Sequence, residues 1–242
     1  GADVVAHAVL VNANDIAVTG VRPRWFLATI LLPEGIGEDE IRALYDGMRE
    51  TLERHDILLV GGHSEITASV RQTVVSGYMM GFAPDGAFVS TADMRAGDVV
   101  LQIGAAPVEG AAVLANEATA AAQTLSPALR NAALNALEDP GISVVEAALR
   151  AMALGAHAMH DPTEGGLSAG LYEMAEAARL ALHLDEEAVL WFAPGTALCA
   201  ATGADPWGAL ASGALLAAFS HESAETAQRT LVTEGYAAAT IA

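Results

Sequence analysis

The amino-acid sequence predicts a mixed α/β (α+β) protein built from two domains. Short apolar runs of strand length alternate with longer amphipathic segments of helix length along all 242 residues. Residues 82–97 form a turn-rich stretch with one proline, an Asp-Gly pair and a closing glycine. We therefore expect an N-terminal domain over residues 1–90 and a C-terminal domain over residues 91–242.

The N-terminal part contains patterns for two helices and three strands. The helical patterns cover Ala2–Thr19, which ends at Gly20, and Glu38–His55, whose apolar residues recur every three or four positions. The strand patterns are apolar or β-branched and cover Trp25–Leu32, Ile57–Val60 and Thr73–Phe82. The second strand is expected to run directly into a glycine turn.

The C-terminal part alternates the same two patterns. The predicted strands are Asp98–Ile103, Leu180–Leu184, Gly213–Phe219 and Tyr236–Ile241, and a short segment, Ala156–His160, is left without an assigned structure. The predicted helices are Val108–Thr124, Pro127–Leu137, Ile142–Leu154, one from Gly165 and Gly166 to Ala178, one from Pro194, and Glu222–Glu234. Mixed strands and helices joined by crossovers indicate an α/β or α+β architecture.

The charge balance excludes several functions. The formal net charge is −19, and every basic side chain apart from histidine is arginine, because the chain has no lysine. Nucleic acid is therefore not an expected partner, since phosphate contacts need a basic surface. A P-loop is excluded because it requires its lysine. Any bound ATP would have to be neutralised by metal ions and backbone amides.

Hydropathy and cysteine content narrow the class further. Hydrophobic residues make up 53% of the chain, yet no charge-free apolar run reaches the length of about 18 residues that a membrane span needs. The first residues lack a basic leader, so a cytoplasmic protein is expected. Cys199 is the only cysteine, which excludes an intrachain disulfide, and its apolar neighbours predict a buried thiol.

Asn12 and Asp15 form the first candidate site. They are three residues apart, so on a helix they share a face that also carries apolar side chains such as Val9 and Ile16. A carboxylate on an apolar face needs a partner, and Mg²⁺ is a natural one. The alternative is a solvated helix end.

Gly61, Gly62 and His63 follow a hydrophobic strand and form the second candidate. Two glycines allow the backbone to approach a ligand, and their amides can hold phosphate oxygens. The alternative is a tight turn without a ligand.

The segment from His160 to Leu167 is the third candidate. Gly165 and Gly166 open a helix, whose amides would point at a bound anion. Asp161, just before them, could hold a metal that phosphates share. The alternative is that Asp161 and Thr163 only cap the helix.

These segments, in this order, resemble one family. Four segments are similar to motifs of the aminoimidazole ribonucleotide (AIR) synthetase superfamily. They are Asn-Asp-Ile-Ala at the end of Asn12–Ala17, Gly-Gly-His-Ser from residue 61, Asp-Pro-Thr-Glu-Gly-Gly-Leu from residue 161, and Asp205–Leu215, which contains Ala-Ser-Gly. This superfamily includes selenophosphate synthetase, thiamine-monophosphate kinase and the hydrogenase-maturation carbamoyl dehydratase. The hydrogenase-maturation and selenophosphate branches are the nearest in pattern.

The resemblance implies a two-domain fold, with an N-terminal sheet that forms a homodimer and a C-terminal α/β layer. It implies ATP between the domains, held through Mg²⁺ rather than lysine. Asp15 and Asp161 match the metal aspartates. Asn12, Gly61, Gly62, His63, Thr163, Gly165 and Gly166 match nucleotide-binding positions. Gly104–Gly110 matches a loop that faces a small-molecule second substrate; no catalytic residue is assigned.

The sequence also departs from the family pattern. Members carry an acidic, glycine-containing segment and a Thr-Asp strand before the first helix of this chain. The chain ends in Thr240-Ile241-Ala242, without the terminal cysteine of the hydrogenase-maturation branch. His63 stands where other branches have Asp or Glu. Two hypotheses follow: an enzyme that uses ATP and Mg²⁺ to phosphorylate an oxygen of a small substrate, or a non-catalytic nucleotide-binding or assembly module.

Overall fold

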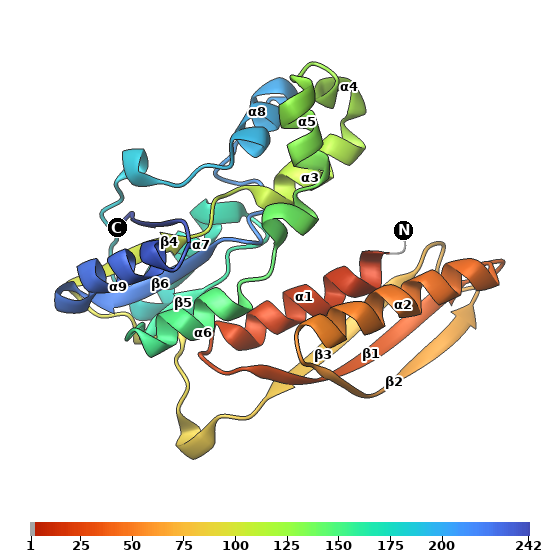
Figure 1. The fold of residues 1–242 in the computed structure, drawn as a ribbon, viewed down its shortest axis with the longest axis horizontal. Helices are drawn as coiled ribbons and strands as arrows, with labels where there is room; N and C mark the ends of the chain where they lie inside the picture. The colour runs from red at the N-terminus through yellow and green to blue at the C-terminus, as the bar shows by residue number, and fades with distance from the viewer. Residues whose placement is uncertain (1–2) are drawn as a thin grey trace. The chain divides into compact units, whose positions relative to one another are not determined.

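The computed structural model describes residues 3–242, which form two compact units (Figure 1). The first unit comprises the described residues up to Ala17 together with Val21–Ala87. The second comprises Val18–Gly20 and Phe88–Ala242. Ala2, where the first predicted helix begins, lies outside the described residues. Both units combine helices with a sheet, which confirms the predicted mixed architecture.

The first unit is a three-stranded sheet in the order β2-β1-β3, with two helices. β1 (Pro23–Pro33) pairs parallel with β2 (Leu58–Thr67) and antiparallel with β3 (Val74–Gly81). α2 (Glu38–Arg54) connects the two parallel strands, as a parallel pair requires. α1 (Asp3–Ala17) packs on α2 and β3.

The core of this unit lies between the helices and one face of the sheet. Along β1 the buried side chains alternate with more exposed ones, as expected for a strand with one covered face. Beyond Pro23 at its start, the buried set on β1 consists of Phe26, Ala28, Ile30 and Leu32. Figure 1 shows α1 and α2 on the same side of the sheet. Among the described residues of this unit, no helix or strand covers the opposite face.

The second unit contains a four-stranded antiparallel sheet in the order β5-β6-β4-β7. Its strands are β4 (Asp98–Ile103), β5 (Ala158–His160), β6 (Leu215–Ser220) and β7 (Ala238–Thr240). Its helices are α3 (Val108–Glu117), α4 (Thr119–Ala122), α5 (Pro127–Leu134), α6 (Val145–Ala153), α7 (Gly166–Ala178), α8 (Ala193–Thr202) and α9 (His221–Thr233). Four short helical turns complete the chain: η1 (Pro84–Gly86), η2 (Thr91–Asp93), η3 (Leu137–Gly141) and η4 (Glu186–Ala188).

The helices of the second unit fall into two groups. α6 and α9 pack against the sheet, and α7 buries Leu167, Leu171 and Met174 in a cluster with Leu216 and Ala218 of β6. α3, α4, α5 and α8 pack mainly on one another (Figure 1). None of the helices over residues 3–242 combines the length and hydropathy that a membrane crossing requires.

Three sequence predictions of secondary structure are wrong. The residues after Val60 do not form a turn, because β2 continues to Thr67. Leu180–Leu184 is not a strand, although Leu180 and Leu182 pack on the core of the unit. The helix expected over Val108–Thr124 is interrupted at Ala118, whose φ/ψ of −100°/54° is not helical.

Candidate functional site

Asn12 and Asp15 on α1 have different surroundings. Asn12 is half-buried and donates from Nδ2 to the carbonyl of Ala8 (2.8 Å). It packs against Gly77 of β3, where an added Cβ would lie 2.7 Å from Nδ2. Asp15 is exposed, because the buried face of α1 runs through Val5, Val9, Ala13 and Ala17. The expectation that Asp15 lies on an apolar face is therefore wrong.

Sequence reasoning missed Asn14, which is fully buried. Its position three residues before Ala17 places it on the covered face of the helix. The segment Asn-Ala-Asn-Asp contains three polar residues, and the rotation of the helix about its axis decides which of them faces the core. The four-residue spacing of Val5, Val9 and Ala13 was the available signal.

Gly61, Gly62 and His63 lie within β2, opposite Leu27, Ala28 and Thr29 of β1. The expectation of a phosphate-holding turn is corrected here, because these residues are part of the parallel ladder. Gly62 has φ +143°, and an added Cβ would lie 2.1 Å from the carbonyl oxygen of Ala28. Close packing of two strands thus explains this glycine without a ligand.

The same three residues line a cavity of about 210 Å³ between the sheet and α2. Tyr45 of α2 reaches across it, and its hydroxyl hydrogen-bonds the hydroxyl of Ser64. His63 is exposed, with Nε2 3.5 Å from a carboxylate oxygen of Glu65. The cavity wall therefore offers an imidazole and two hydroxyls, and none of its lining side chains other than the histidine is basic.

Asp161 directly follows β5 and is buried, with 6% of its surface exposed. Its Oδ1 lies 4.0 Å from Nδ1 of His160, whose Nε2 contacts Oε2 of Glu173 at 2.5 Å. The N-cap position of α7 is Gly165, which has no side chain to cap this end. The hydroxyl of Thr163 donates to the carboxylate of Glu164 (2.9 Å) rather than capping the helix. For Asp161 the capping alternative stays a prediction.

The first turn of α7 is closed largely by the chain itself. The amide of Gly166 donates to the carbonyl of Thr163 (3.1 Å), and the amide of Ser168 donates to the carbonyl of Trp207 (3.1 Å). The prediction that these helix-opening amides are free is wrong for these two. An added Cβ at Gly166 would lie 2.4 Å from the oxygen of Trp207, so close backbone packing requires this glycine.

The segments around residues 104–110 and 205–213 meet beside α7. The amide of Gly110 donates to the carbonyl of Leu210 (2.9 Å), and Gly104 faces the carbonyl of Gly213. Ser212 is fully buried, and over residues 3–242 its Oγ has no hydrogen-bond partner. A cavity of about 430 Å³ opens here between Gly110 and Asp205. Buried hydroxyls are normally satisfied, so Ser212 is a candidate that the site prediction missed.

Asp15 and Asp161 belong to different compact units, and within residues 3–242 no three His, Cys, Asp or Glu side chains form a ready-made metal site. Mg²⁺ commonly uses one or two protein carboxylates and completes its shell with water and phosphate oxygens. A buried carboxylate such as Asp161 has the right ligand chemistry for such an ion.

The chain belongs to the AIR synthase related family. The N-terminal domain of that family matches residues 1–83, and the C-terminal domain matches residues 95–242. The predicted family and its two-part fold are thus confirmed.

Particular relatives lie in the hydrogenase-maturation branch. The carbamoyl dehydratase HypE of Bradyrhizobium diazoefficiens is 29% identical over 226 residues, which cover 93% of this chain and 63% of the relative. The chain thus spans less than two thirds of that protein. The fold is similar to the crystal structure of HypE in complex with ATP (TM-score 0.81, 22% identity, 98% and 69% of the two chains). It is also similar to ThiL with AMPPCP and TMP (TM-score 0.78, 18% identity, 99% and 73%).

Proposed function

We propose that this chain, in domains 1–90 and 91–242, forms part of an enzyme that uses ATP and Mg²⁺ to phosphorylate an oxygen of a small substrate. The observation that carries the proposal is a buried carboxylate, Asp161, at the start of the segment that leads into α7. Family membership through both domains supports it. The ATP and AMPPCP bound to two proteins of the same fold support the choice of nucleotide.

Asp15 and Asp161 would hold the metal ion. When bound, Mg²⁺ neutralises phosphate charge, a role that this chain cannot give to lysine because it has none. Burial of Asp161 keeps competing water away from one ligand and increases its attraction for a cation. Asn12 and Thr163 remain proposed nucleotide contacts, together with the glycines at 61, 62, 165 and 166 and with His63.

The first turn of α7 limits what the backbone can contribute. The amides of Gly166 and Ser168 are already donors to Thr163 and Trp207. Phosphate binding at this end would therefore depend on the metal and on side chains more than on a ring of free amides. The buried hydroxyl of Ser212 adds one polar atom in the neighbouring segment.

A second candidate function is a non-catalytic nucleotide-binding or assembly module. This second function is favoured by the backbone amides at the start of α7, which already donate to carbonyl groups of the protein. Phosphoryl transfer depends on hydrogen-bond donors that point at the negative charge of the transition state, and these amides are not available for that role. The two functions differ in one measurable property. A module binds ATP without consuming it, whereas an enzyme transfers the γ-phosphoryl group to a substrate or to water.

Calorimetric titration of ATP into the chain, with Mg²⁺ or with a chelator, tests the proposal. We expect binding at least about 10-fold tighter with Mg²⁺, because the net charge of −19 repels uncomplexed ATP. Equal affinity in the chelator would exclude the metal-bridged site, and absence of binding under both conditions would contradict nucleotide binding. Release of phosphate from the bound ATP then separates the enzyme from the module.

A further inference from the structure

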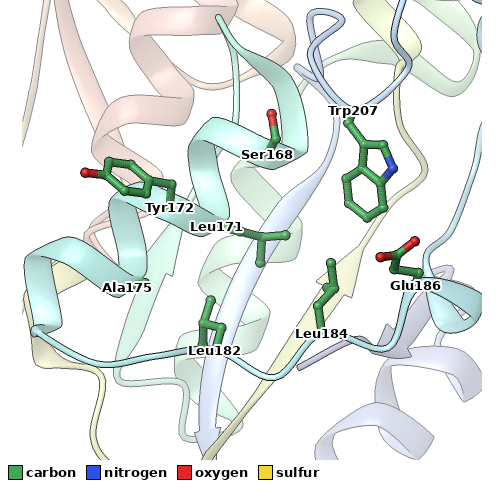
Figure 2. A pocket seen from close by; sticks show the side chains of 8 residues that line it. All are labelled: Ser168, Leu171, Tyr172, Ala175, Leu182, Leu184, Glu186 and Trp207. Atoms are coloured by element: carbon green, nitrogen blue, oxygen red, sulfur yellow. The ribbon is translucent and has the colours of Figure 1, made fainter.

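A third cavity, whose lining includes neither of the proposed metal carboxylates, lies along α7 within the second unit (Figure 2). Its volume is about 360 Å³, which is enough for a small organic ligand. α7 supplies one wall with residues 168, 171, 172 and 175, a spacing that places them on one face of the helix. The chain after α7 supplies Leu182, Leu184 and Glu186, and Trp207 closes one end. We call this space the α7 cavity.

The aromatic end of the α7 cavity is held in place. The amide of Trp207 donates to Oδ1 of Asp205 (3.0 Å), and its carbonyl accepts from the amide of Ser168 (3.1 Å). The indole meets that of Trp191 edge-on, with ring centroids 4.9 Å apart and an interplanar angle of 88°. A flat hydrophobic surface is therefore already ordered before a ligand arrives, which lowers the entropy cost of binding.

Two polar groups of the α7 cavity, Glu186 and Ser168, favour a ligand that donates hydrogen bonds. Glu186 brings an exposed carboxylate on the Trp207 side of the cavity (Figure 2). Ser168 donates its hydroxyl proton to the carbonyl of Gly165 (2.9 Å), so only its lone pairs remain for a ligand. The hydroxyl of Tyr172 points away from Trp207. None of the eight lining residues is basic, which disfavours an anion such as a nucleotide phosphate.

We propose that the α7 cavity binds a flat organic cation. Its ring would lie against the indole of Trp207 and the leucines, where burial and cation–π attraction both contribute. Its amidinium, guanidinium or ammonium group would pair with the Glu186 carboxylate. The net charge of −19 also raises the local concentration of cations near the surface. This site is independent of the proposed nucleotide site, because it requires neither Mg²⁺ nor phosphate.

Three probes of nearly equal shape test the charge preference: benzamidinium, the neutral benzamide and the anionic benzoate. The chain has three tryptophans, so 5-fluorotryptophan labelling gives three fluorine resonances, which single Trp→Phe variants assign. We expect benzamidinium to shift the Trp207 resonance saturably, with a Kd on the order of 1 mM for so small a ligand. The Trp25 resonance, from the other unit, should not move. Benzamide should bind more weakly and benzoate most weakly.

Two neighbouring acids provide a matched pair of variants. Glu186→Gln should raise the benzamidinium Kd on the order of 10-fold, because it removes the charged partner. Glu187→Gln, in the same turn η4 (Glu186–Ala188) but outside the cavity lining, should leave the Kd unchanged. Ala175→Phe, on the half-exposed face of α7, should fill the cavity and abolish the shift. A Trp207 resonance that benzamidinium leaves unmoved, equal affinity for all three probes, or equal effects of the two glutamine variants would overturn the proposal.

Discussion

Asp161 is a position whose sequence context allows two interpretations. Its place before Pro162 and a pair of glycines suggested either a helix cap or a metal ligand. Gly165 is the N-cap of α7, in the left-handed region with φ +78°, so Asp161 does not occupy the N-cap position itself. Its carboxylate is buried, and the proposed role as a metal ligand is compatible with that burial.

Replacement of Asp161 by Asn tests its proposed role. Asn keeps the shape and one acceptor oxygen but is a much poorer Mg²⁺ ligand, so we expect Mg-ATP affinity to fall at least about 10-fold. The melting temperature should change by only a few degrees, because Asn keeps the shape of the side chain and caps a helix about as well as Asp. Asp139→Asn is a matched control, since Asp139 is exposed and also precedes a proline. Intact Mg-ATP binding in Asp161→Asn would remove Asp161 from the metal site.

Cys199 illustrates a residue whose chemistry follows directly from its sequence context. The thiol is fully buried in α8, as predicted, and burial raises its pKa, with the negative charge of Asp205 adding to the shift. We expect a thiol reagent to modify the native protein at least about 100-fold more slowly than the unfolded chain. The free energy of unfolding should also fall as the pH rises above about 8.5, because the unfolded thiol deprotonates first. Fast labelling of the native protein would contradict this environment.

For single residues, the sequence predicted the chemical character of a site better than the burial and contacts of its side chains. Cys199 is buried, as its apolar neighbours in sequence indicated, whereas the burial of Asp161 was not predicted. The exposure of Asp15 and the burial of Asn14 depend on the rotational phase of α1, which two polar neighbours leave ambiguous. The pairing of Gly62 with Ala28, and of Gly166 with the carbonyl of Trp207, involves residues about 35 to 40 positions apart, and no local pattern encodes it.

Most elements were predicted close to their observed bounds, including the short strand β4, and the wrong predictions have separate causes. α2 and α9 have clear amphipathic spacing, and their observed bounds lie within one residue of the prediction at each end. Leu180–Leu184 alternates apolar residues because Leu180 and Leu182 pack on the core, although the segment pairs with no strand. β2 extends through two glycines because β1 provides a parallel partner, which outweighs their low strand propensity. For the break at Ala118 we find no physical cause in the sequence.

Gly62→Ala tests whether this glycine serves the strand. The added Cβ would lie 2.1 Å from the carbonyl oxygen of Ala28, and the φ of +143° is unfavourable for alanine. We expect the free energy of unfolding to fall by about 2 kcal/mol or more, measured by urea denaturation. Gly37→Ala is the control, because a Cβ there meets nothing within 4 Å and its φ is −79°. If both variants are equally stable, the glycine has another purpose, such as access for a ligand in the adjoining cavity.

On the scale of the whole molecule, the two-part pattern of elements and the order of the motifs predicted the family and its fold. The order mattered more than any one motif, because each short segment has a structural explanation of its own. The site could not be predicted to the same depth, since ligand contacts depend on how distant segments meet. Gly104–Gly110 and Leu210–Gly213 illustrate this, because their contact joins residues about a hundred positions apart.

The uncovered face of the first sheet leads to a prediction about assembly. Leu58, Val74 and Tyr78 lie on this face and are 62%, 43% and 64% exposed. Along β1 and β3, successive side chains point alternately to this face and to the face that α1 and α2 cover. Trp25 and Leu27 lie on the same face and are half-buried. β2 is also an edge strand with every residue except Thr67 exposed. An apolar sheet face and an open edge favour pairing with another chain.

We therefore expect the chain to form a homodimer through this sheet. Tyr78→Glu, on the uncovered face, should shift the mass measured by light scattering from dimer to monomer at micromolar concentration, because dimerisation would bury its charge. Val232→Glu is the matched control, since Val232 is 52% exposed on α9, far in sequence from the sheet, and the variant should remain a dimer. A monodisperse monomer of the unmodified chain in solution scattering would refute the assembly. Equal dissociation of both variants would instead place the interface elsewhere.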